Sequence, residues 1–316
     1  MPKRTAAGDD SNAGSKKLKT GSRKAAKRAK YEAKGRKIKL EKAAAKRERQ
    51  DKARKIREAQ GDDACPKGVP RTLESMREYD VTTVAEGDIE AEKDEAYDEM
   101  RAYFNNETQP KVLITMAEHG RLAAWKFCYE LRKCIPNSQV LGRRRYGLKD
   151  LIKKAIAKEY TDLIVVNDDN SVPNGLMLCH LPAGPTAYFK INNFTFTKQL
   201  KRKGESTSHN PEIILNNFNT RLGHTIARML SCLFPQAPKF HGRRVVTFHN
   251  QRDYIFFRHH RYEFKKEGEK AALLELGPRF TLRLKWLQKG TFDSQGDYEW
   301  VLKRHEMETS RRRFFL

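Results

Sequence analysis

Hydrophobic and polar residues alternate most regularly between residues 276 and 290, where the sequence reads LGPRFTLRLKWLQKG. The Gly277-Pro278 pair predicts a turn, because glycine adopts unusual backbone angles and proline presets its own. The residues that follow have the period of two that is typical of a half-buried strand. Their apolar members are Phe280, Leu282, Leu284 and Trp286, and their polar members are Thr281, Arg283 and Lys285. We therefore predict a strand with one face in the core and one cationic face.

The same pattern predicts strands and helices from residue 111 to residue 290. Short apolar runs predict strands, and apolar residues three or four apart predict helices. Strands are predicted at residues 112–116, 163–166, 176–178, 187–196, 213–215, 245–248, 254–257 and 280–287. Helices are predicted to begin near residues 122, 148 and 222. In the first helix, Leu122, Trp125 and Tyr129 are predicted to lie on the buried face. The fold class is therefore predicted to be α/β.

Several of these features occur twice and in the same order. The matched stretches are 142–144 with 242–244, 162–166 with 253–257, and the Gly-Pro pairs 184–185 with 277–278. We therefore predict two related α/β halves, about 110–197 and 211–290, within one domain at 110–295. In place of the second helix of the first half, the second half is predicted to have the strand 245–248.

Charge is distributed unevenly along the 316 residues, whose net charge is +24. Residues 1–60 carry 22 Lys and Arg against 7 Asp and Glu, residues 61–109 carry 5 against 14, and the remainder carries 37 against 19. A positive excess on the folded part as well as on the tail indicates a polyanionic partner. The simpler alternative is a solvated, generally basic surface.

Three segments lie outside the predicted domain. Residues 1–60 have almost no large apolar side chains, so this basic tail alone is expected to be disordered or transiently helical. Its basic runs fit both a nuclear import signal and phosphate contacts. Residues 61–109 are predicted to be an acidic linker, or a segment that folds back along the domain or binds a basic partner. Residues 296–316 are predicted to be a basic C-terminal tail.

The sequence contains no recognisable catalytic motif. It lacks a GxxxxGK[ST] phosphate loop, a GxGxxG motif and HExxH. Its five cysteines form no CxxC pair, and Cys128, Cys179 and Cys232 lie in apolar patterns that predict core positions. A zinc site is disfavoured because His259 and His260, as neighbours in a strand, point to opposite faces. We therefore expect no enzymatic activity, no cofactor, no metal and no membrane association, and an intracellular location.

The remaining candidate residues are cationic. The clusters are Arg143, Arg144 and Arg145; Lys201, Arg202 and Lys203; and Arg243 and Arg244, with Arg258, Arg261 and Arg311–Arg313 as further candidates. Arginine binds phosphate oxygens bidentately and also stacks on bases. No single helix collects these charges as a reader of the DNA major groove would. The pattern therefore favours irregular RNA over duplex DNA.

Two of these clusters are predicted to act differently. Arg143–Arg145 precede a helix predicted to begin near Leu148, whose free amide groups can help to hold a phosphate, so we predict that this cluster contacts RNA. Arg243 and Arg244 lead into a strand instead, and we predict that they lie nearer a protein partner along the strand edge. The simpler alternative is that both clusters are solvated loops.

Through its strand–helix repeat and above all the stretch LGPRFTLRLKWLQKG, the sequence resembles the Brix domain family of eukaryotic ribosome-assembly proteins over roughly residues 110–295. The run PRTLESMREYD and the ending EWVLKRHEMETSRRRFFL resemble a family member that acts on the large ribosomal subunit. The resemblance implies that each half is similar to the anticodon-binding domain of class II aminoacyl-tRNA synthetases. It also implies a non-enzymatic factor of the nucleolus that binds ribosomal RNA and supports its processing. Its implied partners are a small assembly protein and other pre-60S factors.

The resemblance further implies that the Gly-Pro strand region binds RNA. Carried over to this sequence, that role falls on Arg279, Arg283, Lys285 and Lys289. The first half keeps only Lys190 in the matching stretch, so the role is not extended to it. Two alternatives remain open: a protein-docking scaffold in pre-ribosomes whose basic tails only localise it, and an RNA-modifying enzyme, which the missing motifs disfavour.

Overall fold

The computed structural model describes residues 11–60, 71–72, 74–85, 87–143, 146–265, 270–307, 310 and 312–316. The chain divides into two compact units, residues 1–70 and residues 71–316. In the first unit, the described part is one helix, α1 (Ser11–Gln60). Its Ala, Lys, Arg and Glu residues have high helix propensity, and its described side chains, from residue 31 onward, are exposed. The described part of the predicted tail, residues 11–60, is helical in the structure.

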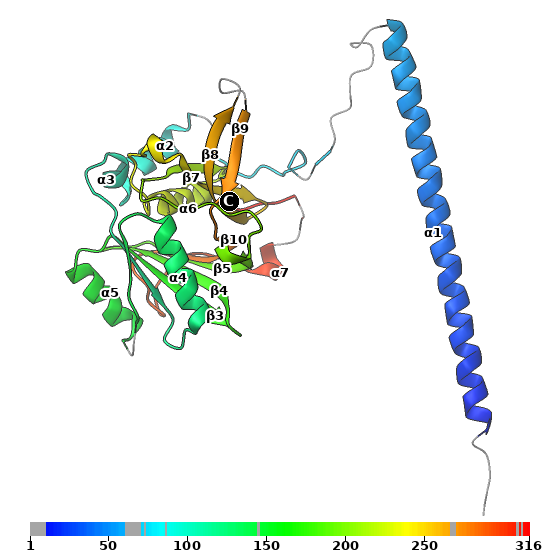
Figure 1. Ribbon diagram of the computed structural model, residues 1–316, viewed down its shortest axis with the longest axis horizontal. Coiled ribbons are helices and arrows are strands. Elements are labelled where there is room, and N and C mark those ends of the chain that lie inside the picture. Colours follow the sequence, from blue (N-terminus) through cyan, green and yellow to red (C-terminus); the bar gives the residue numbers. More distant parts are fainter. Residues whose placement is uncertain are drawn as a thin grey trace, which may run out of the picture. The chain divides into compact units, whose positions relative to one another are not determined.

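The second unit is built on an eleven-stranded mixed sheet (Figure 1). Its main strand order is β2-β1-β3-β4-β5-β10-β8-β7-β6, with β9 paired to β8 and β11 paired to β10. Pairing is parallel for β2-β1-β3 and for β7-β6 and antiparallel elsewhere. The strands are β1 (Val112–Met116), β2 (Ser138–Val140), β3 (Asp162–Asp169), β4 (Val172–His180), β5 (Thr186–Thr195), β6 (Glu212–Asn216), β7 (Arg244–Gln251), β8 (Tyr254–Lys265), β9 (Lys270–Glu275), β10 (Arg279–Gln288) and β11 (Tyr298–Val301).

Helices lie on both faces of this sheet. We call the face covered by α4 and α6 the inner face and the opposite one the outer face; α5 covers the outer face of the first half. All three helices predicted in the domain are present. The helices are α2 (Ile89–Tyr97), α3 (Arg101–Phe104), α4 (Leu122–Cys134), α5 (Leu148–Ala157), α6 (Arg221–Ser231) and α7 (Arg304–Met307), with 3-10 turns η2 (Thr197–Gln199) and η3 (Phe240–Gly242).

The strand order confirms two related α/β halves. In the first half β1, β3, β4 and β5 follow one another by a parallel step and two antiparallel steps, and β6, β7, β8 and β10 do the same in the second. The two halves join through the antiparallel pair β5–β10, which relates them by an approximate two-fold axis. The predicted matching was wrong in one respect. The counterpart of β3 is β7, so residues 162–166 correspond to the strand at 244–251 rather than to 253–257, and the strand 245–248 does not replace the second helix of the first half as predicted.

The two hydrophobic clusters of the domain lie on opposite faces of the sheet. The larger one, on the inner face, packs Phe127 of α4 and Ile226 of α6 against strands of both halves. The smaller one packs Ile152 and Ala155 of α5 on the outer face of the first half. Cysteines contribute to both: Cys128, Cys179 and Cys232 are at most 1% exposed, as predicted. In α4 the buried residues are Ala124, Phe127, Cys128, Leu131 and Cys134, whereas the predicted Leu122 is 67% exposed and Tyr129 is 48% exposed.

Each Gly-Pro turn packs against the opposite half. Gly184 has a φ of +108°, and a Cβ atom there would lie 2.2 Å from the backbone carbon of Gly290, just after β10. Gly277 has a φ of +70°, and its Cβ atom would lie 2.7 Å from Oγ1 of Thr197, just after β5. Both the backbone angle and the close approach therefore require glycine. The two contacts are reciprocal, as the approximate two-fold axis demands.

A β-bulge in β10 changes the predicted alternation. Phe280, Leu282 and Leu284 are buried in the inner cluster as predicted. The pairing register with β5 then shifts between Leu284 and Trp286, because Leu284 faces Phe189 and Trp286 faces the adjacent Tyr188. Trp286 is consequently half-buried on the outer face, stacked on Tyr188 at 5.5 Å between ring centroids. The prediction that Trp286 shares a face with Leu284 was therefore wrong.

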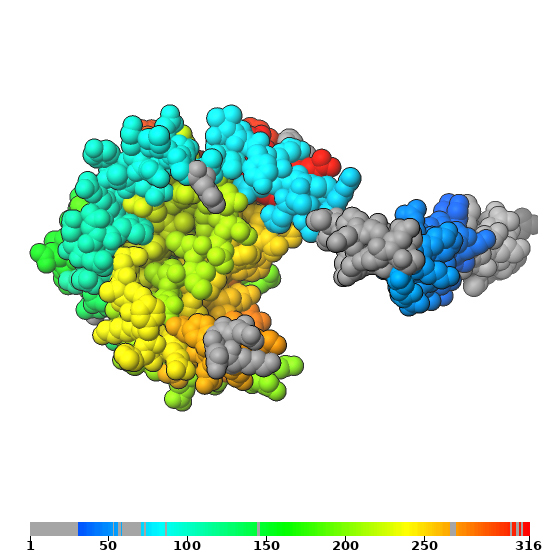
Figure 2. All heavy atoms as spheres, turned by 90° about the horizontal axis from the view of Figure 1, so that it is seen from above, coloured from blue at the N-terminus to red at the C-terminus, as the bar shows by residue number. Residues whose placement is uncertain are grey.

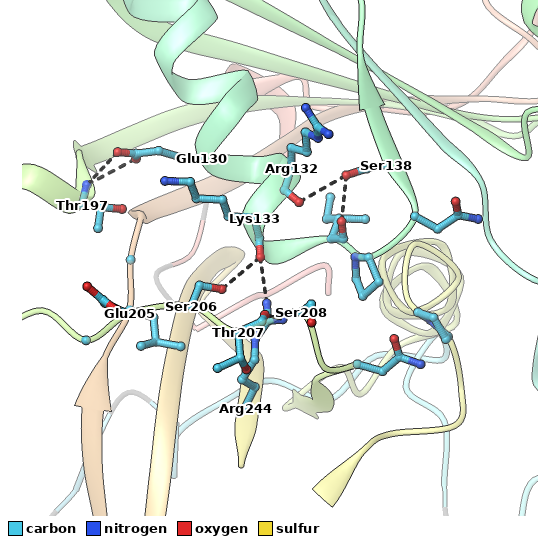
Figure 3. A pocket seen from close by; sticks show the side chains of 18 of the residues that line it. Glu130, Arg132, Lys133, Ser138, Thr197, Glu205, Ser206, Thr207, Ser208 and Arg244 are labelled. Carbon is cyan, nitrogen blue, oxygen red and sulfur yellow. Dashed lines mark hydrogen bonds between the residues drawn. The ribbon is translucent and has the colours of Figure 1, made fainter. Parts of the chain in front are cut away.

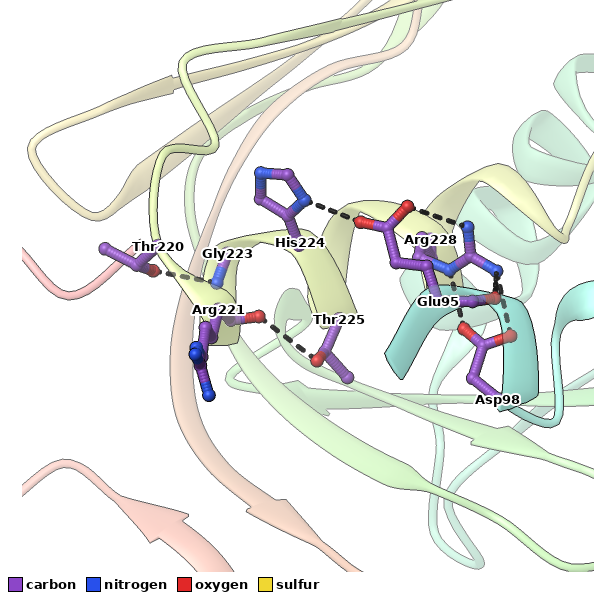
Figure 4. A network of polar contacts seen from close by, with 8 residues as sticks. All are labelled: Glu95, Asp98, Thr220, Arg221, Gly223, His224, Thr225 and Arg228. Carbon is purple, nitrogen blue, oxygen red and sulfur yellow. Dashed lines mark hydrogen bonds and ion pairs between the residues drawn. The ribbon is translucent and has the colours of Figure 1, made fainter. Parts of the chain in front are cut away.

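Part of the acidic stretch folds back onto the domain, one of the alternatives that the sequence left open. Glu95 of α2 and Asp98, the residue after α2, contact the basic side of α6 (Figure 4). Arg228 donates to both oxygens of Asp98 at 2.6 and 2.8 Å, and Glu95 accepts from His224 at 2.7 Å and from Arg228 at 3.4 Å. Tyr103, in α3, is 6% exposed and packs edge-on against His180 of the first half at 5.2 Å. This segment therefore contacts both halves.

Residues 312–316 are also part of the folded domain. The backbone amides of Phe315 and Leu316 donate to Oδ1 of Asp253 at 2.7 and 3.0 Å, and the Leu316 side chain is 1% exposed. Arg77 donates to the carbonyl oxygen of Leu316 at 3.2 Å. In Figure 2 the cyan residues that precede the domain lie beside these red ones. Part of the predicted C-terminal tail thus packs against the chain that leads into α2.

Candidate nucleic-acid interface

The outer face of the second half has no counterpart of α5. In the first half, α5 lies in the connection that leads into β3. The corresponding connection, residues 232–243 between α6 and β7, is described throughout and contains only the turn η3. The exposure of equivalent side chains reflects this difference. Leu113 in β1 is 2% exposed, whereas Ile214 in β6 is 41% exposed.

We call this uncovered surface the open face. Its members follow from the strand registers, because side chains of paired residues point to the same side of a sheet. They include Lys190 and Asn192 of β5, Arg279, Thr281 and Arg283 of β10, Tyr254, Phe256, Arg258 and His260 of β8, Thr247 and His249 of β7, Glu212 and Ile214 of β6, and Glu275 of β9, and of these Thr281 is only 2% exposed. The Lys and Arg side chains of the open face outnumber its carboxylates, and aromatic rings lie among them.

Positive side chains lie next to one another across the strands of the open face. Arg283 is directly paired with Lys190. Arg279 and Arg258 are neighbours, since the adjacent residues Phe280 and Phe257 are paired. Like charges directly opposite each other repel and destabilise a sheet. An anion bound across the open face would relieve this repulsion.

Aromatic rings accompany these cations. The Arg283 guanidinium lies 5.0 Å from the ring centroid of Tyr254, and its Nη1 donates to the Tyr254 hydroxyl at 3.3 Å. The guanidinium of Arg258 lies 5.9 Å from the ring of Phe256. Such cation–π contacts orient a guanidinium, and exposed aromatic rings provide surfaces on which bases can stack.

The cations of the open face differ in how far they are neutralised. Nε of Arg279 donates to Oε1 of Glu275 at 2.9 Å, and this hydrogen bond lowers the pKa of the Glu275 carboxyl. The pKa of the Arg258 guanidinium is also lowered, first by burial and then by the positive charge of Arg279. Arg258 therefore lies in a positive environment, whereas Arg279 already has a counter-ion within the chain.

The other predicted RNA contacts lie away from the open face or at its border. Lys285 is half-buried at the bulge, and Lys289 is exposed beside the carboxylates of Asp98, Glu99 and Glu299. Nε of Arg143 donates to the carbonyl oxygen of Tyr146 at 2.7 Å. Arg144 and Arg145 lie outside the described residues. Lys201, Arg202 and Lys203 are exposed in the connection between the halves.

Arg244 is buried, so its side chain is not available to the protein partner that the sequence predicted for it. It is 3% exposed and donates to the carbonyl oxygens of His209 at 2.7 Å, Lys133 at 2.8 Å and Cys134 at 3.3 Å, as well as to that of Thr207. Its Nε donates to Nε2 of His259 at 3.2 Å. Arg243, by contrast, is exposed with a φ of +47°. The prediction of a partner contact therefore rests on Arg243 alone.

The sequence reasoning missed Lys190 and the aromatic residues Tyr254 and Phe256. A signal for these residues was present, because Tyr254, Phe256 and Arg258 have the period of two of one strand face. Lys190 could not be assigned without knowing that β5 pairs with β10.

Among the described residues, no three His, Cys, Asp or Glu side chains are grouped so that they could hold a metal ion. No described helix combines the length and the apolar composition needed to cross a membrane.

Comparison with known proteins gives a consistent family. Residues 121–286 match the family model of the Brix domain. A Brix domain-containing protein of Caenorhabditis elegans is 68% identical over 272 residues, which cover 86% of this chain and 71% of that protein. Ribosome production factor 1 of Xenopus laevis is 59% identical over 82% of this chain and 76% of its own length. The mouse protein of that name is 56% identical over 87% and 78%.

Similarity to solved structures is more distant. The crystal structure of a probable ribosomal biogenesis protein from Aeropyrum pernix matches with a TM-score of 0.42 and 13% sequence identity. The match covers 61% of this chain and 99% of that protein.

Proposed function

Because this chain belongs to the Brix-domain family, we propose that it is a non-enzymatic ribosome-biogenesis factor that binds ribosomal RNA through the open face. The observation that carries the RNA contact is the juxtaposition of Lys190, Arg283, Arg279 and Arg258 with aromatic rings on an uncovered sheet face. Positive charge attracts the phosphate backbone, and aromatic rings and guanidinium planes stack on unpaired bases. Loops and unpaired regions of ribosomal RNA present both.

The relatives' names guide the cellular part of the proposal. Proteins called ribosome production factor 1 match this chain over most of its length. We propose that the chain acts in the nucleolus on precursors of the large ribosomal subunit and supports processing of their RNA. A small assembly protein and other pre-60S factors are its proposed partners.

Charge reversal on the open face tests the RNA contact. The double variant Arg258→Glu with Arg283→Glu should bind a large-subunit ribosomal RNA transcript at least about tenfold more weakly than the unchanged chain, in filter binding at fixed salt. The matched control is Lys126→Glu with Lys153→Glu, which changes the net charge equally at exposed positions on α4 and α5. Thermal unfolding of both variants checks that they remain folded. Equal losses of affinity in the two variants would show that only net charge matters and would refute the interface.

The basic helix α1 should add affinity without selectivity, because lysine-rich segments contact phosphates rather than bases. Removing residues 1–60 should flatten the dependence of binding on salt concentration and leave the order of preference among different RNAs unchanged. Competition between ribosomal and unrelated RNAs measures that order. A changed order of preference would mean that the tail recognises particular RNA sequences.

A docking function has support from a separate surface, the hairpin arm formed by residues 262–265 of β8 and 270–273 of β9. Phe264 and Leu273 are 63% and 61% exposed on this arm, and Arg243 lies at its base with Arg261. Apolar and cationic groups together suit an acidic, partly apolar segment of a protein. Arg243→Glu should therefore reduce the amount of the small assembly protein that co-purifies while crosslinks to RNA persist. Loss of RNA crosslinks with the partner retained would reverse this assignment.

A further inference from the structure

A pocket of about 1070 Å³ lies where the two halves meet (Figure 3). One wall is the last turn of α4 and the residues after it. The opposite wall is the connection between the halves, with Lys198 in η2 and residues 203–208 beyond it. Leu276 and Gly277, at the start of the Gly-Pro turn, also border the pocket. The pocket is thus distinct from the open face, although both are built where β5 and β10 join the halves.

The lining of the pocket is mainly cationic and polar. Its cations are Arg132, Lys133, Lys198, Lys203 and Arg244, against the two carboxylates Glu130 and Glu205. Glu130 already accepts hydrogen bonds from the backbone amide of Thr197 at 3.1 and 3.3 Å, and burial raises the pKa of its carboxyl group. The side chains of Lys133, Lys198 and Lys203 are exposed at the rim. The net charge of the lining therefore favours an anion.

Arg244 makes this position electrostatically suitable for an anion. The C-terminal end of a helix carries a partial negative charge on its free carbonyl groups, which would repel a phosphate. Here the guanidinium of Arg244 binds the carbonyl oxygens of Lys133 and Cys134, the last two residues of α4. It also binds those of Thr207 and His209 on the opposite wall. One buried cation thus neutralises the end of the helix and joins the two walls.

Hydroxyl groups complete the lining. The Ser206 hydroxyl donates to the carbonyl oxygen of Lys133 at 3.2 Å. The Thr207 hydroxyl oxygen is shielded from solvent, so the hydroxyl groups that a ligand can reach are those of the exposed residues Ser206 and Ser208. A ligand with hydroxyl and phosphate oxygens can form hydrogen bonds with them. By contrast, no aromatic side chain lines the pocket among the described residues, so bases would find no stacking surface there.

We propose that this pocket binds the sugar–phosphate backbone of single-stranded RNA. The proposal rests on the RNA-binding function above and adds a second site with a different kind of recognition. The rim lysines hold phosphate oxygens, and the hydroxyl groups meet the ribose. We infer an unpaired strand rather than a duplex, because an unpaired backbone is flexible enough to follow the hollow between the walls. Without stacking, recognition at this site is independent of base sequence.

The test compares charge-reversed pairs in the full chain. The probes are a fluorescent oligouridine and an RNA duplex, each of about twelve nucleotides per strand, a length within the range of known single-strand sites. The pocket pair is Lys133→Glu with Lys198→Glu, and the matched control is Lys126→Glu with Lys153→Glu. The pocket pair should bind oligouridine at least about tenfold more weakly than the control does, with a smaller change for the duplex. An oligoadenosine of equal length should behave like oligouridine.

A second measurement locates the strand. Oligouridine with 4-thiouridine should crosslink to peptides from residues 130–138 or 197–208, and excess inorganic phosphate should not abolish these crosslinks. Abolition by phosphate would mean that the pocket is a free-phosphate site, and crosslinks confined to the open face would overturn the proposal. The proposal would also be overturned if the pocket pair and the control lost the same affinity for oligouridine, or if the pocket pair lost the same affinity for the duplex as for the single strand. If the unchanged chain binds no RNA at all, the proposed function itself is wrong. If the unchanged chain binds RNA but the pocket pair binds oligouridine as tightly as the control pair does, only this inference is wrong.

Discussion

The two halves of the domain have the same strand order but use their outer faces differently. In the first half, α5 covers strands whose outward side chains, such as Leu113, are buried. In the second half the equivalent strands lack this helix, and Ile214 is 41% exposed in the position that corresponds to Leu113. The insertion of one helix in a connecting loop therefore decides whether a sheet face becomes core or surface. The uncovered face carries the cations Arg258, Arg279 and Arg283.

A second difference lies at the first residue of β3 and of its counterpart β7. That residue is Asp162 in the first half and Arg244 in the second, and each contacts a buried histidine on the next strand. Burial lowers the pKa of His180, but the hydrogen bond and the charge of Asp162 outweigh burial and raise it overall. For His259, burial and the charge of Arg244 act together and lower the pKa to about 4. The buried histidines of the two halves thus lie in opposite electrostatic environments, although by strand register the counterpart of Asp162 is Val246 and Arg244 lies two residues before it.

The largest predicted effect tests the covered outer face. Leu113→Ala should lower the free energy of unfolding by about 2–5 kcal/mol, since it leaves a cavity between α5 and the sheet. The matched change on the open face, Ile214→Ala, should cost roughly 1 kcal/mol or less, because much of that side chain already contacts water. Urea unfolding of both variants measures the difference. Equal costs would mean that the outer face of the second half is covered in solution.

The pH dependence of stability should separate the two histidines. The unfolded chain binds a proton at His259 near pH 6.5, but the folded protein binds it only near pH 4, so stability is lost as the pH falls between these values, by up to about 3 kcal/mol. His259→Gln should remove most of this loss. His180 has the opposite sign: the stability it adds is complete below its unfolded pKa and is lost as the pH rises through its folded pKa. His180→Gln should therefore make the free energy of unfolding fall more steeply as the pH is lowered.

Urea unfolding at several pH values between about 4 and 8 measures how the free energy of unfolding of each variant depends on pH. Identical changes of slope in the two variants would contradict opposite environments for the two histidines.

The smallest predicted effect concerns Lys190, which belongs to the first half but faces Arg283 on the open face. Lys190→Glu should weaken binding of ribosomal RNA about threefold to tenfold, because it replaces one phosphate contact by a repulsive charge. Lys153→Glu on α5 should leave RNA affinity almost unchanged. Fluorescence anisotropy at two salt concentrations gives both values. An unchanged affinity for Lys190→Glu would place the RNA-binding boundary within β10.

Much of the fold could be predicted from the sequence, because apolar runs and three-to-four spacing reflect burial directly. Eight of the eleven strands, the three domain helices and the duplication were visible in this way, whereas β2, β9 and β11 were not predicted. The buried side of α4 could not be predicted, because Phe127 with Leu131 and Leu122 with Tyr129 both have helical spacing. Only the position of the sheet determines that Phe127 and Leu131 are buried. The bulge before Trp286 could not be foreseen either, since an extra residue leaves no mark on an alternating pattern.

The candidate site could be predicted only in part. Arg279 and Arg283 lie on a cationic strand face as the alternation indicated. Their neighbours Lys190 and Arg258 come from strands whose pairing depends on the whole topology. Arg244 was assigned to a partner because its Arg-Arg pair leads into a strand rather than a helix, yet it alternates with Val246 and Phe248, both buried. Alternation was therefore a better guide to this residue than charge.

The reciprocal packing of the two Gly-Pro turns bears on how the domain unfolds and on how it arose. Gly184 meets Gly290 across the junction, and Gly277 meets Thr197 in the mirrored position. Contacts in which each of two copies gives and receives the same interaction are those of an isologous dimer. A duplicated chain that once closed as a homodimer would leave this arrangement after fusion. Neither half can complete its own turn without the other, so the two halves are expected to melt as one cooperative transition.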